Sequence, residues 1–326
     1  MLDFKDNDQL AANISVSSMP EDQSRLFVLK PDNKENKIDA IIEALKNDQV
    51  ILVQNLHQKE ADALMYSVAE KFNLGGSLEL QAAFAASLGH RENIGKYYMT
   101  VNKRDNYQFV SPHSEGSSFT NLQLASFFCE ANTTDGGETI LLNINPDCNV
   151  WGVLREQVKR GRSSRPMTAT EIKQARALFR LNMPEDTLRA NDEILVQKDI
   201  NEIFSFFDVL AKPQKTYSKI LDKQCYAYWD SIESTDLDSV KEFAQLLRDN
   251  GLLKLPVNHF DDKKFDDSND RRVRGFGNKY GQLFKCKITH KLAAGDFIIL
   301  NNLTWCHSVS NWTPGSGVRK VAAAFA

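Results

Sequence analysis

Leu292-Ala-Ala-Gly-Asp-Phe-Ile-Ile-Leu-Asn-Asn-Leu-Thr-Trp-Cys-His307 is the stretch that says most about the fold of this chain. Gly295 and Asp296 predict a turn, and the apolar run 297–300 predicts a buried strand. A short loop then leads to His307. The stretch therefore carries the chain from a turn, through the core, to a side chain that commonly binds metals or transfers protons.

Two candidate partners of His307 lie far upstream, at His113 and Glu115. Residues i and i+2 of an extended backbone share a face, so both side chains can reach one metal ion. Imidazole and carboxylate ligands together suit Fe(II), Mn(II) or Zn(II), and three such ligands leave room for a co-substrate and dioxygen. Alone, a His-x-Glu pattern is a common surface pattern. Cys306 is expected to be structural, because adjacent residues of a strand point to opposite faces.

Arg319 is the third unusual feature, because it begins an apolar run, 318–325, in which Lys320 is the only other charge. Burying a cation without a partner is costly, so Arg319 needs an anion. A dicarboxylate co-substrate would provide one through a bidentate pair. A salt bridge to an Asp or Glu of the chain is the alternative that the residues leave open.

Four elements, taken in order, resemble the Fe(II)/2-oxoglutarate-dependent oxygenases, in particular the taurine-dioxygenase and clavaminate-synthase-like group. They are His113-Ser-Glu115, Gly136-Gly-Glu-Thr139, the run 295–302 that leads to His307, and Arg319. The resemblance implies that His113, Glu115 and His307 bind Fe(II). It implies further that Arg319 and Thr139 bind the distal carboxylate of 2-oxoglutarate. It covers residues 48–326 in outline and is specific only in these four places.

The resemblance also implies a class of reaction. A carboxylate at Glu115, where related halogenases have a small residue, implies oxygen chemistry, and hydroxylation above all. The expected enzyme is a dioxygenase that hydroxylates a small amino-acid-like molecule or an intermediate of secondary metabolism, and forms succinate and CO2. Two alternatives stay open: a cupin-like metal enzyme that does not use 2-oxoglutarate, and a non-catalytic jelly-roll binding module. The sequence departs from the group at Asn301, where Asp is common, and in the 192-residue spacing from Glu115 to His307.

The predicted fold class is α/β: a double-stranded β-helix (jelly roll) with N-terminal helices and a large helical insertion. Residues 1–35 are expected to form a loosely attached polar arm and 36–326 a single oxygenase domain, with the insertion at about 146–270. Strands before and after the insertion close one β-core. Predicted core strands are 50–53, 97–101, 107–110, 122–129, 138–142, 283–288, 297–300 and 318–325, with 122–129 and 138–142 as neighbours in a hairpin. Predicted helices are 37–46, 58–72 and 78–88, and within the insertion 150–158, 169–181, 200–210 and 237–247.

Composition narrows the possible partners. The 326 residues are 42% hydrophobic and 25% charged, with a net charge of −3, which argues against a surface that binds nucleic acid or an anionic membrane through bulk charge. No apolar run approaches the roughly 20 residues that span a bilayer. Five scattered cysteines indicate reduced thiols and a cytoplasmic protein. The charged stretch 259–274 is expected to be an exposed loop. The sequence predicts no oligomeric state.

Overall fold

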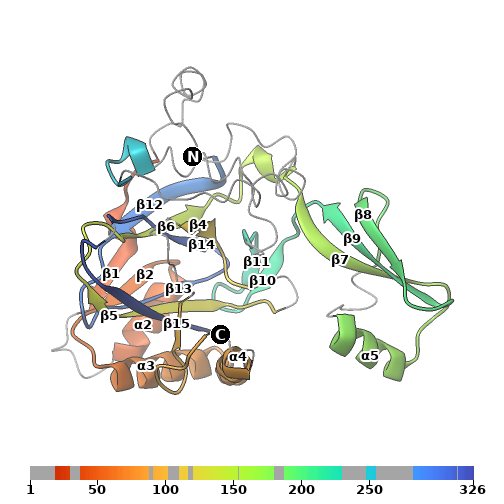
Figure 1. Cartoon of the computed structure of the whole chain (residues 1–326), viewed down its shortest axis with the longest axis horizontal. Coiled ribbons are helices and arrows are strands. Elements are labelled where there is room, and N and C mark those ends of the chain that lie inside the picture. The colour runs from red at the N-terminus through yellow and green to blue at the C-terminus, as the bar shows by residue number, and fades with distance from the viewer. Residues whose placement is uncertain are drawn as a thin grey trace.

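The computed structural model describes residues 19–29, 37–87, 91–101, 110–116, 120–152, 154–179, 187–229, 247–254, 282–313 and 315–326. Its centre is a pair of stacked β-sheets with helices against one of them (Figure 1). The large sheet has the order β1 (Leu26–Leu29), β2 (Val50–Val53), β13 (Phe297–Asn301), β5 (Leu124–Asn132), β15 (Arg319–Phe325) and β3 (Met99–Thr100). The small sheet has the order β12 (Phe284–His290), β6 (Thr139–Ile144), β14 (Trp305–Val309) and β4 (Val110–His113).

The space between the two sheets is filled by side chains that alternate along the strands. Phe127 and Ile298 of the large sheet belong to the same buried cluster as Leu141 and Trp305 of the small sheet. Apart from the edge strand β12, which carries Lys285 and Lys287, the strands of the two sheets have no Lys, Arg, Asp or Glu at their centres, because both of their faces are covered. The inter-sheet face is therefore the hydrophobic centre of the molecule, and any polar group on it calls for an explanation.

Helices cover the other face of the large sheet. They are α2 (Lys37–Lys46), α3 (Gln58–Lys71) and α4 (Gly75–Ser87). Ile41 and Met65, each fully buried, pack with Ile299 and Phe128 of the sheet. The other face of the small sheet is covered by irregular segments, where Trp151 of the short 3-10 helix Asn149–Gly152 packs near Cys306. Both sheets are thus covered on their outer faces. We call the large and the small sheet together the sandwich.

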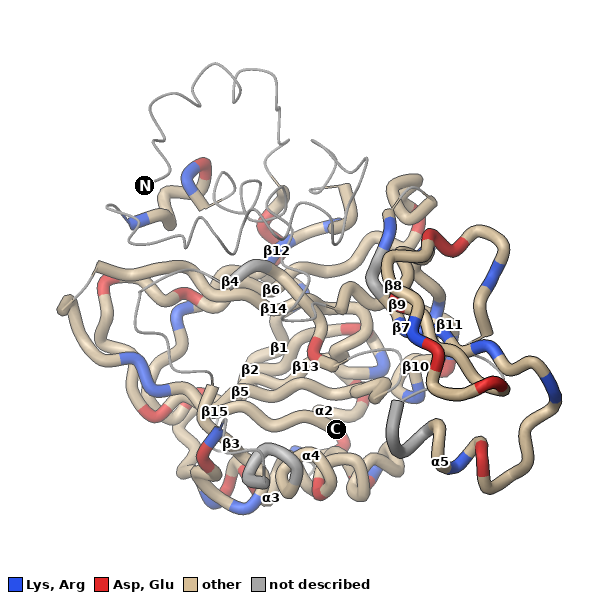
Figure 2. The backbone as a smooth tube through the Cα atoms, turned by 45° about the vertical axis from the view of Figure 1, so that its right-hand side comes forward, with Lys and Arg blue, Asp and Glu red and all other residues tan. Residues whose placement is uncertain are grey.

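A third sheet, of three strands, lies apart from the sandwich (Figure 1). It has the order β7 (Glu156–Ser163), β9 (Phe204–Ala211) and β8 (Glu193–Asp199), and it is accompanied by α5 (Ala169–Phe179). We call β7, β8, β9 and α5 the outer sheet. Two short strands, β10 (Thr216–Ser218) and β11 (Lys223–Cys225), follow it along the chain. Figure 2 shows charged residues spread along the outer sheet, whereas the strands of the sandwich carry few.

Three predictions about the fold are wrong. Where the structure describes the insertion, it is mostly β-structure: 200–210, expected to be helical, contains β9, and 150–158 contains a 3-10 turn and then the start of β7. Among the described residues of the insertion, only α5 matches a predicted helix. The segments 122–129 and 138–142 do not form a hairpin, because β5 and β6 belong to different sheets. The arm is not loose at residues 19–29, where β1 pairs in parallel with β2.

Other predictions hold or lie elsewhere. The N-terminal helices and the strands at 50–53, 283–288, 297–300 and 318–325 are confirmed to within a few residues. The charged stretch 259–274 and nearly all of the helix predicted at 237–247 fall outside the described residues. All five cysteines are free thiols, as expected. Among the described helices, none has both the length and the apolar character needed to cross a bilayer.

Candidate metal centre

Three side chains from two strands meet on the inter-sheet face of the small sheet. His113 ends β4 and His307 lies in the middle of β14, and the two residues are directly opposite each other in the antiparallel register. Their ring centroids are 4.4 Å apart. Glu115 follows β4, and its Oε1 lies 3.6 Å from His113 Nε2 and 3.4 Å from His307 Nε2. One ligand atom from each residue lies within 4.8 Å of the others, a spacing that can hold a metal ion.

Successive side chains of a strand point to opposite faces, and this keeps Ser114 and Cys306 out of the cluster. Ser114 and Cys306 lie between or beside the three residues, but their side chains contact each other at 3.8 Å. Cys306 belongs to the buried cluster on the far face of the small sheet. This confirms the prediction that Cys306 and His307 point to opposite faces. Phe127 of β5 faces the cluster from the large sheet, with its ring centroid 4.7 Å from that of His307.

Asn302 fixes the backbone of Glu115. Its Oδ1 accepts a hydrogen bond from Glu115 N at 2.8 Å, and its Nδ2 donates to Glu115 O at 3.0 Å and to Leu122 O at 2.8 Å. Asn302 is completely buried, so these bonds are not shared with solvent. The neighbouring Asn301 bonds instead to Leu303 N and Ser218 Oγ. Asn301, which stands where the resembled group commonly has Asp, therefore makes its hydrogen bonds away from the cluster.

The surroundings favour the ionisation states that a metal ligand needs. Burial alone would raise the pKa of the Glu115 carboxyl, but hydrogen bonding to the two imidazoles outweighs it, and the pKa lies well below its ordinary value. Burial lowers the pKa of His307 to about 4, and the charge of His113 adds to this effect. A carboxylate and a neutral imidazole are the forms in which Glu115 and His307 would bind a divalent metal. Only about a fifth of the Glu115 side chain is exposed.

Arg319 lies on the same inter-sheet face, at the start of β15, because it shares the strand face of Val321, Ala323 and Phe325. Its Nε donates to Gly137 O at 3.3 Å, and its Cζ lies 5.9 Å from the ring centroid of Trp312. Burial lowers the pKa of its guanidinium to about 10. Within the described residues, no Asp or Glu forms an ion pair with Arg319.

The glycine pair of the predicted motif makes room for this arginine. Gly137 has φ +72, and a Cβ there would lie 2.9 Å from Arg319 Cδ. A Cβ at Gly136 would collide with the backbone carbonyl of Asn311. Only glycine fits both conditions: a left-handed backbone at Gly137 and a close backbone contact at Gly136. The same pair carries the chain from the large sheet to the small one, which a hairpin would not do.

Thr139 begins β6 directly after the glycine pair. It pairs with Val309 of β14, two residues beyond the Leu141–His307 pair, so it shares the inter-sheet face of His307. Its Oγ1 is buried and has no hydrogen-bond partner. A buried hydroxyl without a partner is rare and calls for an explanation. The structure thus brings four of the five predicted site residues from three adjacent strands of the small sheet, β4, β14 and β6, and adds Arg319 from the facing sheet.

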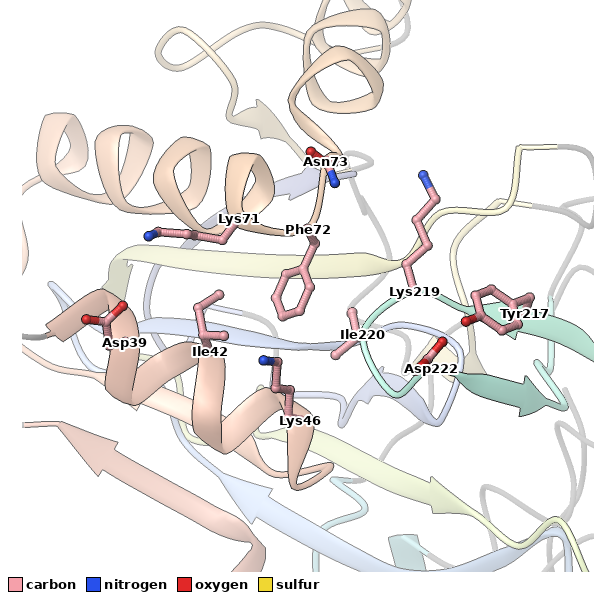
Figure 3. A pocket seen from close by; sticks show the side chains of 10 residues that line it. All are labelled: Asp39, Ile42, Lys46, Lys71, Phe72, Asn73, Tyr217, Lys219, Ile220 and Asp222. Carbon is pink, nitrogen blue, oxygen red and sulfur yellow. The ribbon is translucent and has the colours of Figure 1, made fainter.

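A separate pocket lies on the opposite side of the large sheet, between α2, the end of α3 and the β10–β11 turn (Figure 3). Its volume is about 670 Å³. The lining residues are Asp39, Ile42, Lys46, Lys71, Phe72, Asn73, Tyr217, Lys219, Ile220 and Asp222. None of the five predicted site residues contributes to it. The candidate metal centre is therefore distinct from this pocket.

Comparison with known proteins gives likenesses of overall structure alone. No family model matches the chain, and no curated protein matches its sequence. PvcB from Pseudomonas aeruginosa is 11% identical, with a TM-score of 0.43 over 94% of this chain and 89% of that one. A second PvcB structure, described as an Fe, alpha-ketoglutarate dependent oxygenase from an isonitrile synthetic pathway, has 9% identity and a TM-score of 0.41 over the same shares. AAD-2 in complex with Mn(II) and N-oxalylglycine has 13% identity and a TM-score of 0.38, over 94% of this chain and 96% of that one. At these scores the likenesses do not assign a function.

Proposed function

We propose that this chain is an Fe(II)/2-oxoglutarate-dependent oxygenase of the taurine-dioxygenase and clavaminate-synthase-like group, with a jelly-roll core. The observation that supports this most strongly is the convergence of His113, Glu115 and His307 on a face that also holds Arg319. Three ligands on one side of an ion leave the other positions open, which suits non-haem Fe(II) oxygenases. A closed structural site would need a fourth protein ligand.

The residues present fit the metal. Two imidazoles and one carboxylate form a borderline ligand set, and the ligand atoms are already close enough to share one ion. The fit extends to the protonation states, since the pKa of Glu115 is low and that of His307 is lowered to about 4. In this proposal His113, Glu115 and His307 hold the iron, and Asn302 holds Glu115 in place.

The residues also fit the co-substrate. Arg319 supplies a buried guanidinium that lacks an ion-pair partner among the described residues, and Thr139 supplies a buried hydroxyl without a partner. A carboxylate of 2-oxoglutarate would give both groups what they lack, through charge-assisted hydrogen bonds. The Gly137 carbonyl holds Arg319 Nε, which leaves the two terminal nitrogens of the guanidinium for a bidentate pair.

The proposed reaction balances as substrate R–H, O2 and 2-oxoglutarate giving R–OH, succinate and CO2. One oxygen atom enters the substrate and the other enters succinate. Bound iron and 2-oxoglutarate supply the oxidising chemistry. The chain orients both, and the inter-sheet apolar side chains, Phe127 among them, keep water from the reacting atoms. The substrate that we propose is a small amino-acid-like or secondary-metabolite molecule, and we propose a cytoplasmic location.

The decisive test is anaerobic addition of Fe(II) and 2-oxoglutarate to the full chain, with detection of the metal-to-ligand charge-transfer absorption band. We expect the band in the wild type. We expect Arg319→Gln to raise the Kd for 2-oxoglutarate roughly 10- to 150-fold, since a hydrogen bond to a charged group contributes about 1.5–3 kcal/mol.

Lys320→Gln is the matched control, because Lys320 is the next cation along β15, points to the other face and is exposed. It should bind 2-oxoglutarate like the wild type. A cupin-like enzyme that does not use 2-oxoglutarate would give no band, and a binding module would release no succinate with any substrate. An Arg319→Gln titration identical to that of the wild type would remove 2-oxoglutarate from the proposal.

A further inference from the structure

The pocket between α2, the end of α3 and the β10–β11 turn has an apolar floor (Figure 3). Phe72 and Ile220 are buried members of the cluster on the helical side of the large sheet, and Ile42 packs against that cluster. Tyr217, from β10, adds an aromatic ring that is 44% exposed. The volume of about 670 Å³ is in the range of small-molecule sites. The floor is therefore suited to the apolar body of such a molecule.

Exposed charged side chains surround this floor. Three are lysines and two are aspartates, namely Lys46, Lys71, Lys219, Asp39 and Asp222. Within the described residues, none of the five forms an ion pair or a side-chain hydrogen bond. In the view of Figure 3 the ammonium group of Lys46 lies between Ile42 and Ile220. Asp39 and Asp222 lie at opposite ends of the pocket in that view. The charge at the middle of the apolar floor is therefore an ammonium group that no described carboxylate neutralises.

One wall of the pocket is hydrogen-bonded to the support of the metal centre. Gln123 is buried, and its Oε1 accepts from Lys219 N at 2.9 Å, while its Nε2 donates to Tyr217 O at 3.2 Å. The backbone oxygen of Gln123 accepts from Asn302 N at 2.9 Å. Asn302 Oδ1 in turn accepts from Glu115 N at 2.8 Å. Two lining residues are thus joined to a proposed metal ligand through two buried residues.

An occupant of this pocket has to match both parts of its lining. Covering Phe72 and Ile220 removes apolar surface from water, which favours a ligand with a hydrophobic body. The ammonium group of Lys46 attracts an anion, whereas the carboxylates at the two ends repel further negative charge. The chemistry that fits is therefore one apolar body with one anionic group.

We propose that this pocket binds a small monoanion with an apolar body, such as a medium-chain carboxylate, with its charge at Lys46 and its body on the apolar floor. The occupant orders the wall that Gln123 holds, and so strengthens metal binding at the centre that Asn302 supports. Binding in the pocket does not depend on the proposed oxygenase function, whereas the effect on the metal centre rests on it.

The first measurement uses the full chain and octanoate, whose binding is followed by displacement of the fluorescent dye anilinonaphthalene sulfonate. Octanol and octylammonium have the same apolar body and are the uncharged and cationic controls. We expect octanoate to displace the dye at a concentration roughly fivefold below that of octanol, since an exposed ion pair contributes modestly to binding. Equal displacement by all three compounds overturns the proposal.

Variants at Lys46 decide whether this pocket is the site. Lys46→Gln should remove the preference for octanoate over octanol, and Lys46→Glu should reverse it in favour of octylammonium. Lys46 is exposed, so neither change leaves a cavity in the core. The control variant is Lys59→Gln, because Lys59 is exposed near the start of α3, at the far end of that helix from the pocket, and it should behave like the wild type. A preference for octanoate that survives in Lys46→Glu contradicts the assignment.

A lipid surface presents the same chemistry as a free carboxylate, and sedimentation with phosphatidylglycerol vesicles distinguishes the two sources. We expect the chain to stay in the supernatant, because a pocket of this volume admits one small molecule. Co-sedimentation that Lys46→Glu abolishes would overturn the small-molecule proposal in favour of a membrane.

The effect on the metal centre is measured with Mn(II). Saturating octanoate should lower the Kd for Mn(II) roughly fivefold or more, and Mn(II) should lower the Kd for octanoate by the same factor, because coupling between two sites is reciprocal. Gln123→Ala should still bind octanoate but lose this coupling. Lys46→Glu should show no effect of octanoate on Mn(II), which separates the pocket from direct binding of octanoate to the metal. Independent affinities in the wild type overturn the link to the metal centre.

The two proposals fail in different ways. A chain that binds no Mn(II) refutes the metal centre and with it the oxygenase proposal, and the dye measurements still decide whether the pocket binds octanoate. A chain that binds Mn(II) but shows no preference for octanoate refutes only the pocket.

Discussion

The sandwich, apart from the parallel pair of β1 and β2, and the outer sheet are antiparallel β-structures, but they are stabilised differently. Sandwich strands such as β13 are buried along their whole length, whereas β8 is exposed at nearly every position, with Ile194 and Val196 about half exposed. The outer sheet depends on small clusters around Phe207 and Phe204. Every residue assigned to the metal centre lies in the sandwich or in the segments next to it. A sheet that is covered on both faces holds the side chains of a binding site in fixed positions. The outer sheet is covered on one face only and carries none of these side chains.

The largest difference is expected between two variants that each remove a carboxylate, one in the sandwich and one in the outer sheet. Glu115→Ala removes a ligand from the metal centre and should abolish the Fe(II)/2-oxoglutarate absorption band. Glu193→Ala removes a carboxylate from β8 and should leave the band intact. Anaerobic titration with Fe(II) measures both. A normal band in Glu115→Ala would remove that residue from the ligand set.

The second comparison concerns stability. Ile299→Ala leaves a cavity between the large sheet and its helices and should lower the free energy of unfolding by about 2–5 kcal/mol. Phe207→Ala leaves a cavity in the outer sheet, where we expect loss of hydrogen-exchange protection confined to β7, β8 and β9. Denaturant unfolding and hydrogen exchange would measure these effects. Equal loss of protection in both regions would mean that the sandwich and the outer sheet unfold as one unit.

A smaller effect, on metal affinity, is expected for Asn302, which holds the backbone of Glu115. Asn302→Ala removes the hydrogen bonds that hold the Glu115 backbone, and it should weaken metal binding roughly 10- to 100-fold, as changes around metal ligands commonly do. Asn301→Ala is the control within the sandwich, because Asn301 bonds to Leu303 and Ser218 and not to Glu115. Competition with a metal-sensitive dye would give both affinities. If the two variants bind metal equally well, Asn302 does not position Glu115.

The smallest effects concern pH. Burial raises the pKa of Asp48, which lies in the turn between α2 and β2 of the sandwich, so its ionisation opposes folding as pH rises past the unfolded value of 3.8. Asp48→Asn should therefore increase the melting temperature slightly at pH 7, and the gain should disappear below about pH 4.

In the outer sheet, hydrogen bonding to Arg165 lowers the pKa of Glu171 to about 2. Glu171→Gln should lose a small stabilisation that is present at pH 7 and fades as pH falls from 4.5 towards 2. Thermal melts across pH would measure both, and a Glu171→Gln gain at pH 7 would contradict the assignment.

The same contrast explains which predictions succeeded. Long apolar runs, such as 297–300 and 318–325, predicted sandwich strands, because burial on both faces leaves a clear pattern in the sequence. The outer sheet mixes charged and apolar residues: β7 reads Glu-Gln-Val-Lys-Arg-Gly-Arg-Ser. In 200–210 the closely spaced aromatic and aliphatic residues fitted a helix as well as a strand. Only pairing with β7 and β8 made this segment a strand, and no local pattern reveals that pairing.

The sequence by itself determined the chemical identity of the candidate site: two histidines, one glutamate, one arginine and one threonine, in an order that resembles a known class. It did so because residue types and short spacings are local properties. Tertiary structure alone decided that β4 and β14 are neighbours, which brings His113 and His307 into register across 194 positions of chain. It also decided that β5 and β6 separate into two sheets. These are contacts between distant segments, and they arise only when the buried faces of both sheets are satisfied together.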